Sequence, residues 1–548
     1  MPFISTTRDV PATRSRWWRR IALLGLLALW AGTAWWQTNK SLPPGTHVDS
    51  AWSPVAAGDV TFIADISAAD AYGRPVVSQS IFDEVLAAVR AARRFIVLDY
   101  FLFNSELGAT GPGQPLRHVA GELRDALIER HRAQPDLQIL FITDPINEVY
   151  GGSPSQELEL LRAAGIPVVV TNLNRLRDSN VFYSSLWRLG IGWWSGGKST
   201  ATGSTGWLPN PLEESGDPIS FGAWARLLNF KANHRKVLIA DDGRGGLVSI
   251  VGSANPHDAS SAHSNVALKI AGPSMLPLLR SELQVARFSG WSGHLDVPAD
   301  ADPAAGAPEA FSPGAGTAAA GAPAGRDASA GKGSPGGNDT PDSLRVDATA
   351  GRVRVVTEGA IRRELLEKLD STVSGDAIDI AMFYVADRGV VEALLAASRR
   401  GVAVRLILDP NKDAFGRARN GVPNQPAASE LVAASDGAIH VRWYRTHGEQ
   451  FHTKMVMVYG TERFWVMLGS ANLTRRNLAD YNLESDVVFE IGREAALAQQ
   501  MLDYFDALWG NHASLGIEYT ADFGYYADPS QLHYWLYRIM EGTGLSTF

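Results

Sequence analysis

The chain has 548 residues, of which 45% are hydrophobic, so it is long enough to bury two or more sizeable cores. It contains no cysteine, which excludes disulfides, thiol catalysis and cysteine-ligated metal sites. Its 58 acidic residues outnumber its 50 basic residues, and the net charge of −8 argues against a nucleic-acid-binding protein, which tends to present a basic surface.

The chain begins with a basic tail and an apolar segment. Residues 1–20 carry five arginines, four of them between residues 14 and 20, and residues 21–36 are apolar, with a pair of tryptophans at each end of this segment. We predict an uncleaved transmembrane anchor, because tryptophan is typical of membrane interfaces. The alternative is a cleaved signal peptide, since Gly32-Thr33-Ala34 offers small residues for cleavage. In both cases the chain after residue 37 lies on the outer (periplasmic or extracytoplasmic) side of a bacterial-type cytoplasmic membrane, either anchored by a single pass or secreted.

Two parts of the chain, residues 59–296 and 345–515, show the same succession of expected elements. Each has an apolar strand, a helix and a second strand that ends in Asp-Pro, and the matching strands are 95–101 with 378–384 and 137–145 with 402–410. Strands that alternate with helical stretches predict an α/β fold.

Three further segments separate or extend these two parts. Residues 297–344 contain 34 Ala, Gly, Pro or Ser out of 48, too few apolar side chains to form a core, so we predict a flexible, disordered linker. The first part carries a long insertion before residue 234 with an aromatic cluster, which suits either packing over the site or a membrane interface: Phe182, Tyr183, Trp187, Trp193 and Trp194. Residues 516–548 form an aromatic extension that we expect to pack on the second part, with a bilayer surface as the alternative.

A short motif occurs twice. His234-Arg235-Lys236 precedes an apolar run and Gly252-Ser253-Ala254-Asn255, and His452-Thr453-Lys454 precedes another apolar run and Gly469-Ser470-Ala471-Asn472. Chance supplies a single His-x-Lys freely, but not two copies that are each followed by the same Gly-Ser-Ala-Asn. The plainer alternative is a pair of structural histidines in a duplicated fold.

The residue types in the motif suit phosphate chemistry. Residues two apart on a strand share a face, so His234 projects with Lys236 and His452 with Lys454. The neutral side chains add hydrogen-bond donors: Ser253, Asn255, Ser470 and Asn472. Two such sets around a phosphodiester would stabilise charge on its oxygens, and would supply one imidazole to attack phosphorus and another to protonate the leaving oxygen.

The two copies resemble the signature of the phospholipase D superfamily, His-x-Lys-x(4)-Asp followed by Gly-Ser-x-Asn, and the resemblance covers about residues 59–515. The first copy has the Asp of the signature, whereas the second does not: Asp241 and Tyr459 stand at this position. The family often adds an acid in an Asn-x-Glu setting, which Asn482-Leu483-Glu484 fits, while Asn265-Val266-Ala267 has Ala in place of Glu. Each half therefore lacks a different acid.

The resemblance implies two phospholipase D-like α/β/α units that share one active site, preceded by one N-terminal transmembrane helix. It implies a covalent phosphohistidine, with His234 as nucleophile and His452 as acid and base. Lys236, Lys454, Asn255 and Asn472 would then hold the phosphate, with Asp241, Ser253, Ser470 and Glu484 in support. We expect no cofactor and no metal.

The acidic composition and the membrane-proximal start together favour a glycerophospholipid substrate over nucleic acid. We predict a phospholipase D-type phosphodiesterase or phosphatidyl transferase, acting by hydrolysis or by cardiolipin synthase-like transfer. The alternatives are a nuclease of the same family and a non-catalytic lipid-binding scaffold, although a binder has no need of two imidazoles. The sequence indicates neither the head group nor an oligomeric state.

Overall fold

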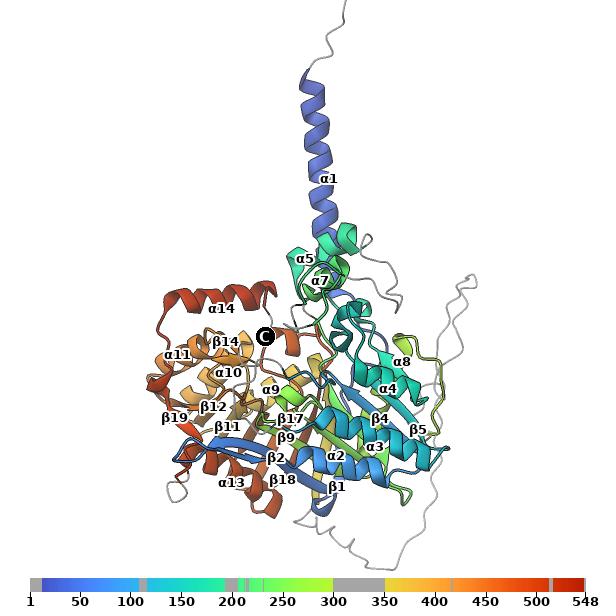
Figure 1. Ribbon diagram of the computed structural model, residues 1–548. Helices are drawn as coiled ribbons and strands as arrows, with labels where there is room; N and C mark the ends of the chain where they lie inside the picture. The colour runs from blue at the N-terminus through green and yellow to red at the C-terminus, as the bar shows by residue number, and fades with distance from the viewer. Residues whose placement is uncertain are drawn as a thin grey trace, which may run out of the picture.

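The computed structural model describes residues 12–107, 116–192, 206–210, 212, 216–229, 231–298, 350–414, 417–511 and 516–546. Two mixed β-sheets form the body, each flanked by helices, and one long helix projects from it (Figure 1). The expected α/β fold is confirmed. The predicted linker at 297–344, apart from its first two residues, and Trp193 and Trp194 of the aromatic cluster lie outside the described residues.

The first sheet has eight strands in the order β3-β2-β9-β8-β7-β4-β5-β6. Strands β4, β5 and β6 pair in parallel, and all other neighbours pair antiparallel. The strands are β2 (Val60–Ala69), β3 (Pro75–Ser78), β4 (Phe95–Tyr100), β5 (Gln138–Thr143), β6 (Val168–Val170), β7 (Lys236–Asp241), β8 (Leu247–Gly252) and β9 (Asn265–Ala271). The helices are α2 (Ile81–Ala91), α3 (Val119–Ala133), α4 (Gln156–Ala163), α5 (Val181–Leu186), α7 (Phe221–Leu227) and α8 (Leu276–Phe288).

The second sheet has nine strands in the order β1-β10-β18-β17-β16-β11-β12-β15-β19. Its strands are β1 (Ser53–Ala56), β10 (Ala350–Thr357), β11 (Ala377–Met382), β12 (Ala403–Leu408), β15 (Ile439–Tyr444), β16 (Lys454–Tyr459), β17 (Arg463–Gly469), β18 (Ser485–Gly492) and β19 (Thr520–Asp522). A short pair, β13 (Asp413–Ala414) and β14 (Arg417–Ala418), lies apart from it. The helices are α9 (Gly359–Asp370), α10 (Arg388–Arg399), α11 (Asn424–Ala434), α12 (Arg475–Leu478), α13 (Ala496–Gly510) and α14 (Gln531–Thr543).

Seven strands follow one another in the same order in both sheets: β2-β9-β8-β7-β4-β5-β6 in the first and β10-β18-β17-β16-β11-β12-β15 in the second. The register corrects one sequence alignment by a single residue. Tyr100 lies opposite Lys236 and Met382 lies opposite Lys454, so the residue that corresponds to Phe101 is Phe383 and not Tyr384.

Apolar side chains fill three layers. On β4, Phe95 and Val97 point into a core between the two sheets, which also takes in α8 and α13, while Ile96 and Leu98 point into a core under α2 and α3. A third core lies between the second sheet and α9, α10 and α11. Strands buried on both faces have no polar side to alternate, which explains their continuous apolar runs.

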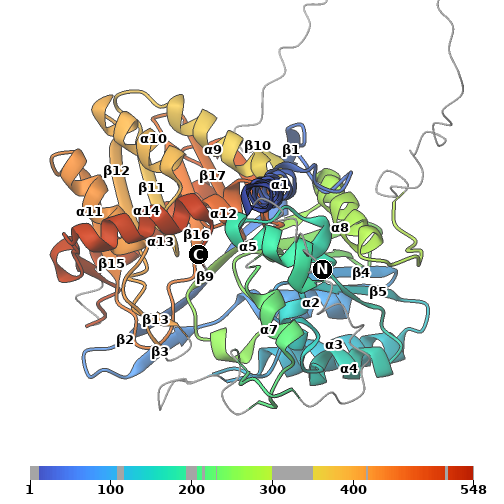
Figure 2. The ribbon, with the colours of Figure 1, turned by 90° about the horizontal axis from the view of Figure 1, so that it is seen from above.

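The ends of the chain complete the second sheet. Residues before 59 supply β1, which pairs with β10, and the C-terminal extension supplies β19, which pairs with β15. The extension then continues into α14, which lies over α11 and α12 (Figure 2).

The N-terminal helix α1 (Ala12–Asn39) is longer than the predicted apolar segment at 21–36, because the flanking basic and tryptophan residues continue the helix. Within it, Trp17–Asn39 is the one helical stretch among the described residues with the length and composition to cross a membrane, a property that signal sequences share. Its apolar side chains are exposed between Ile21 and Leu29, as expected for a helix that leaves the body of the protein.

Candidate active site

The residues beside the two motif copies form backbone bridges between the two halves. Each His-x-Lys lies at the start of a strand, β7 or β16, at the end of the sheet that faces the other half. The His234 N–H donates to Leu483 O at 2.8 Å, and the Leu483 N–H donates to Ala232 O at 3.0 Å. The second copy makes an equivalent cross-link, in which the Ser264 N–H donates to Gln450 O at 3.1 Å. Backbone hydrogen bonds between the halves therefore fix both histidines.

Glu484 of the second half orients His234 of the first half. The His234 Nδ1 atom lies 2.9 Å from Glu484 Oε2, and both side chains are buried. Burial alone would raise the pKa of Glu484, but attraction and hydrogen bonding by His234 outweigh it and hold that pKa below its usual value. The Ser470 hydroxyl also donates to Glu484, at 2.6 Å. An ionised carboxylate can only accept, so the His234 proton sits on Nδ1 and leaves Nε2 with a lone pair.

Asn265 of the first half orients His452 of the second half. The His452 Nδ1 atom lies 3.1 Å from Asn265 Oδ1, and the Ser253 hydroxyl donates to the same oxygen at 2.9 Å. Two corrections follow. The serines bind the partners of the imidazoles instead of presenting donors to a phosphate. In addition, the strand register changes the alignment of the two halves. Gly252 lies opposite Ala267 and Gly469 lies opposite Asp486, so Ala267 corresponds to Asp486. Asn265, two residues earlier, is therefore the counterpart of Glu484.

The two lysines lie close to the histidines and are poorly solvated. Lys236 Nζ contacts His234 O, and Lys454 Nζ donates to His452 O at 2.8 Å. Burial lowers the pKa of Lys236 to about 7, against the attraction of Glu484 and other carboxylates. Burial and repulsion from Lys236 lower the pKa of Lys454 well below its usual value. The charge of Lys236 thus acts on Lys454, the corresponding lysine of the other half.

The imidazoles are also held as neutral groups. Burial lowers the pKa of His234 to about 4, although Glu484 opposes the shift. Burial, together with the charge of Lys454, lowers the pKa of His452 well below its usual value. The site thus concentrates four basic groups that lose their positive charge readily, an environment that favours the arrival of an anion.

Two phenylalanines that the sequence motif does not include wall the site. Phe101 lies 4.9 Å from the His234 ring and 5.2 Å from Lys236 Nζ. Phe383 lies 5.0 Å from the His452 ring and 5.0 Å from Lys454 Nζ. Each phenylalanine directly follows the strand that pairs with the strand of its motif copy. This position was the only feature of the sequence that could have identified the two residues. The rings lie against the basic groups, whose pKa values are lowered mainly by burial.

The two asparagines of the Gly-Ser-Ala-Asn turns are buried at the site. Asn255 Oδ1 accepts the Leu102 N–H at 3.2 Å, which directs its amide group inward. Asn472 Oδ1 is buried and makes no hydrogen bond within the described part of the chain. A buried amide oxygen without a partner is costly, so Asn472 is suited to complete its bonding with a ligand or water.

Asp241, the acid of the first motif copy, is not at the site. It lies at the far end of β7 from Lys236, about 17 Å away along a strand of this length. There its carboxylate accepts the N–H groups of Arg93, Arg94 and Phe95 and caps the turn into β4. Tyr459, at the same position in the second half, donates to Asp379 at 2.7 Å. The acid of the motif therefore supports the fold, and its loss from the second copy does not affect the imidazoles.

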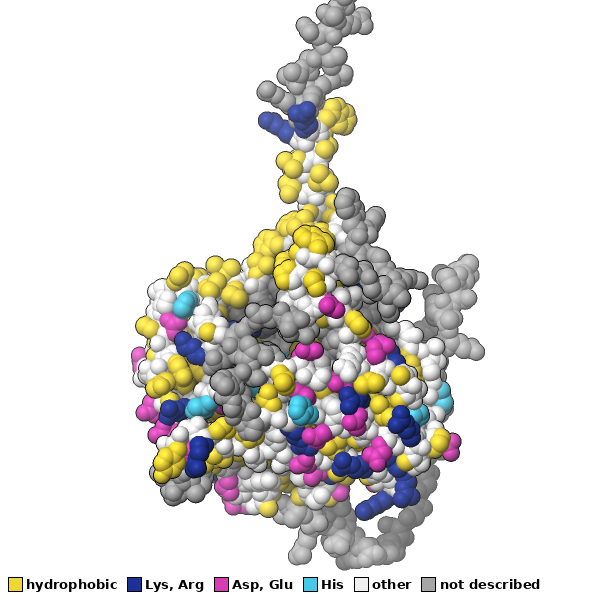
Figure 3. All heavy atoms as spheres, in the orientation of Figure 1, with side chains coloured by type: hydrophobic (Ala, Val, Ile, Leu, Met, Phe, Trp, Pro, Cys, Tyr) yellow, Lys and Arg dark blue, Asp and Glu magenta, His cyan; other side chains and the backbone are white. Residues whose placement is uncertain are grey.

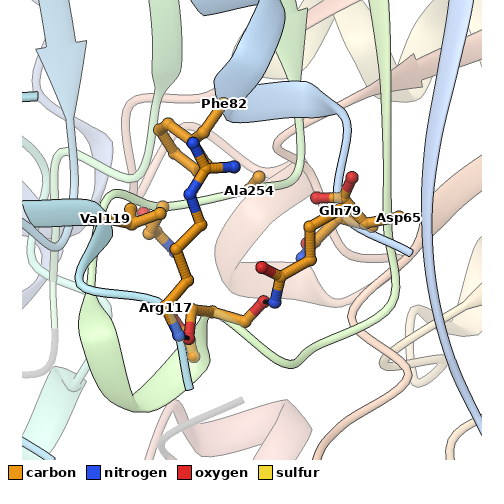
Figure 4. A pocket seen from close by; sticks show the side chains of 10 residues that line it. Asp65, Gln79, Phe82, Arg117, Val119 and Ala254 are labelled. Carbon is orange, nitrogen blue, oxygen red and sulfur yellow. Dashed lines mark hydrogen bonds between the residues drawn. The ribbon is translucent and has the colours of Figure 1, made fainter. Parts of the chain in front are cut away.

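A small polar pocket adjoins the first motif (Figure 4). Asn255 and Asn265 line it, together with Asp65, Gln79 and Arg117. Neither histidine is among the residues that line it, so this pocket is a flank of the site and not the reaction centre.

Comparison with known proteins identifies the class. Residues 365–509 match a family model described as "Cardiolipin synthase, PLD-like domain". Among solved structures, phosphatidylserine synthase from Haemophilus influenzae Rd KW20 is similar over 94% of this chain and 97% of that chain, with a TM-score of 0.50 and 11% identity. At this identity the likeness concerns the fold alone. No curated protein matches the sequence.

Two further solved structures are similar with lower TM-scores. Polyphosphate kinase from Porphyromonas gingivalis has a TM-score of 0.41 and 12% identity, over 89% of this chain and 53% of that chain. The phospholipase D family member Nuc from Salmonella typhimurium has a TM-score of 0.24 and 22% identity, over 31% of this chain and 97% of that chain.

The match at 365–509 defines a phospholipase D-like domain that contains the whole second motif copy. This stretch of the chain resembles the phospholipase D superfamily, and the fold of the whole chain is similar to that of the phosphatidylserine synthase.

Proposed function

We propose that the protein is a phospholipase D-type phosphodiesterase or phosphatidyl transferase that acts on glycerophospholipids through a covalent phosphohistidine. The observation that carries this proposal is the crossed pairing of the imidazoles: each histidine is oriented by a side chain of the other half, His234 by Glu484 and His452 by Asn265. The two similar units thus act as pseudo-repeats around one shared site. A single-site model with two imidazoles suits double displacement at phosphorus.

The difference between the two partners assigns the roles. A carboxylate behind His234 raises the electron density at Nε2 and stabilises the positive ring that forms when Nε2 bonds to phosphorus. A neutral amide behind His452 gives no such stabilisation to an imidazolium, which is therefore a stronger acid. His234 is the nucleophile. His452 takes up a proton when the bound anion raises its pKa, donates that proton to the leaving alcohol, and then takes a proton from water or from a second alcohol.

The remaining residues hold the phosphate. Lys236 and Lys454 neutralise the non-bridging oxygens, and Asn255 and Asn472 supply amide hydrogen bonds. The anion raises the pKa of each lysine that its burial has lowered, so substrate binding restores the charges that stabilise the transition state. No step needs a group from outside the chain except the acceptor, which is water or an alcohol.

The substrate class rests on the net charge of −8 and on the candidate membrane span in α1, which would place the site beside phospholipid. We infer a single-pass anchor with the catalytic part outside the cytoplasmic membrane. A reporter enzyme fused after the last residue should be active only on that outer side. Cytoplasmic reporter activity would refute this topology.

Two experiments test the function. Vesicles of phosphatidylglycerol should yield phosphatidic acid if water is the acceptor, and phosphatidylethanol when ethanol is added if transfer occurs. The variant His452→Ala should still react with a phosphatidyl ester of nitrophenol, because this leaving group needs no protonation. It should release one equivalent of nitrophenolate and retain an acid-labile adduct on His234.

The matched control is His234→Ala, which should form no adduct. An adduct on His452 in that control would reverse the roles and keep the mechanism. Failure of both variants to trap lipid phosphate, together with DNA cleavage by the unaltered chain, would instead support a nuclease. Binding of vesicles without turnover of any diester would support a lipid-binding scaffold.

A further inference from the structure

An exposed apolar stripe runs along the outer face of α14. The inner face of this helix packs on the body, where Tyr537 is buried and its hydroxyl donates to Glu430 at 2.7 Å. The outer face carries four exposed apolar side chains at helical spacing, namely Leu532 (75% exposed), Trp535 (58%), Leu536 (37%) and Ile539 (56%). The other exposed residues of the helix are Gln531 and Gly542, so no exposed residue of α14 is charged. A helix with apolar residues on both faces lacks a partner on its outer face.

A second apolar surface surrounds the base of α1. Helix α5 and the π-helical turn that follows it, Trp187–Ile191, expose Phe182, Leu186 and Leu189. Arg188, the basic residue of this turn, points inward and forms an ion pair with Asp178 at 3.0 Å. The outward side of this surface is therefore also apolar, and its charged side chain points inward.

Contacts fix the direction of α1 relative to this surface. The Ser185 hydroxyl donates to Trp30 O at 2.7 Å, and the Trp30 and Phe182 rings stack at 6.1 Å. The Asp178 N–H donates to Gln37 O at 3.0 Å. Helix α14, α5 and the base of α1 all lie on the side of the body from which α1 projects (Figures 1 and 3).

The length of α1 decides what covers these surfaces. From Trp17 to Leu29, the part of the span that lies beyond the contact with α5, the helix rises about 20 Å. That is shorter than the hydrocarbon core of a bilayer, which is about 30 Å thick. Only the full stretch to Asn39, about 34 Å, spans the core. A bilayer that α1 crosses must therefore also surround the outer face of α5.

We propose that α14 and the α5 surface, with Phe182, Leu186, Trp535 and Ile539 as main contacts, are embedded in the outer leaflet of the membrane that α1 spans. Phospholipid covers the apolar face, because the apolar surface of α1 continues into that of α5, and a bilayer around α1 would contact both surfaces. This inference rests on the proposed lipid-directed function and on the anchor, and it names the surface through which the body meets the bilayer.

The surface is joined rigidly to the catalytic residues. Glu541 of α14 accepts the N–H of Arg475, the first residue of α12, and α12 begins three residues after Asn472 of the Gly-Ser-Ala-Asn turn. Insertion of α14 into the leaflet therefore holds the phosphate-binding turn close to the lipid head groups.

The absence of cysteine from the chain makes a direct test possible. The full chain is reconstituted into vesicles of phosphatidylcholine and phosphatidylglycerol, with a nitrobenzoxadiazole label on Ile539→Cys, on Leu186→Cys, or on Tyr72→Cys as control. Tyr72 is 84% exposed at the hairpin between β2 and β3, on the side of the body away from α1. Lipids with a spin label near the head group should quench the first two labels at least about threefold more strongly than the control, because the apolar face is buried in the interface.

Quenching no stronger than that of Tyr72→Cys would overturn the proposal. Disulfide-linked dimers through residue 539 without quenching would overturn it as well, in favour of a second copy on this face. Activity gives an independent readout. Leu532→Ser combined with Ile539→Ser should reduce turnover of vesicle lipid about tenfold, since membrane affinity scales with buried apolar area.

The same double variant should leave turnover of a water-soluble nitrophenyl phosphodiester unchanged, and Tyr72→Ser should change neither. Equal losses on both substrates would contradict the proposal, because α14 would then act on the fold and not on the bilayer. An unaltered chain that turns over neither substrate would refute the proposed function and leave the quenching result to decide the membrane contact.

Discussion

The variant Glu484→Gln tests whether the carboxylate behind His234 drives nucleophilic attack. The change keeps the shape of the side chain and removes its charge, so that both imidazoles have an amide partner. The His234–Glu484 pair is a charge-assisted hydrogen bond of 2.9 Å between buried groups. Such bonds contribute about 1.5–3 kcal/mol, and about 1.4 kcal/mol corresponds to a factor of ten in rate. We therefore expect phosphohistidine formation to slow by about 10- to 150-fold.

The assay is the burst of nitrophenolate from a phosphatidyl nitrophenyl ester, which reports formation of the adduct separately from its breakdown. Because Glu484 also accepts hydrogen bonds from Ser470 and Asn482, thermal unfolding must show that the variant remains folded. A burst rate within about twofold of the unaltered chain would refute the assigned role, since it corresponds to less than about 0.5 kcal/mol.

The matched change, Asn265→Asp, places a carboxylate behind His452 instead. It should raise the pKa of His452 and weaken it as an acid. The loss of rate should then be larger for an ester of a simple alcohol than for the nitrophenyl ester, whereas Glu484→Gln should slow attack on both. Identical leaving-group dependence in the two variants would show that the two histidines do not have separate roles.

Four further outcomes follow from the site. His234→Ala and His452→Ala should each remove nearly all activity toward lipids with alcohol leaving groups, and the double variant should have scarcely less activity than either single variant. Steady-state kinetics would measure this, and substantial turnover in either single variant would contradict a shared site. Exhaustive chelation should leave the chemical step intact on a soluble diester, because lysines and amides hold the phosphate; a loss reversed by one divalent ion would contradict this. Since burial lowers the pKa of Lys236 to about 7, its ammonium is lost as the pH rises through that value, so inhibition by inorganic phosphate should weaken on the alkaline side, and Lys236→Arg should flatten this dependence. Arg235→Met breaks a fully buried ion pair with Glu358, which should lower the free energy of unfolding by up to about 3–5 kcal/mol. Burial raises the pKa of Glu358 to about 7, so this carboxyl is protonated and uncharged below that pH. Thermal unfolding should therefore show a smaller loss of stability below pH 7 than above it.

The sequence predicted those parts of the site that local patterns determine. The apolar runs and the repeated His-x-Lys identified the α/β fold and the strands β7 and β16, because a strand buried on both faces leaves a continuous apolar signature. The roles of His234 and His452 themselves remain predictions.

The partners of the imidazoles could not be predicted, because they depend on register across strands. The second half has two more residues than the first between its Gly-Ser-Ala-Asn turn and the orienting residue, 472 to 484 against 255 to 265, and the short helix α12 occupies this longer connection. Counting along the chain therefore aligned Glu484 with Ala267. Only the hydrogen-bonded register shows that Asn265 takes its place. The prediction that Asp241 supports the site was wrong for a similar reason. The spacing of residues along a strand does not show which groups surround the far end of that strand.

Under the proposed mechanism, the crossed partners make catalysis a property of the assembled pair of units. His234 lies 250 residues from its carboxylate, and His452 lies 187 residues from its amide. A unit folded alone would keep its lysine and its asparagine and could still attract phosphate. Its imidazole, however, would lack the acceptor that fixes the proton on Nδ1 and directs Nε2 at the substrate. In the proposed mechanism, a phosphate ion could thus bind to one half, but attack at phosphorus would require both halves. The different acceptors that the two halves supply would then make one histidine a nucleophile and the other an acid.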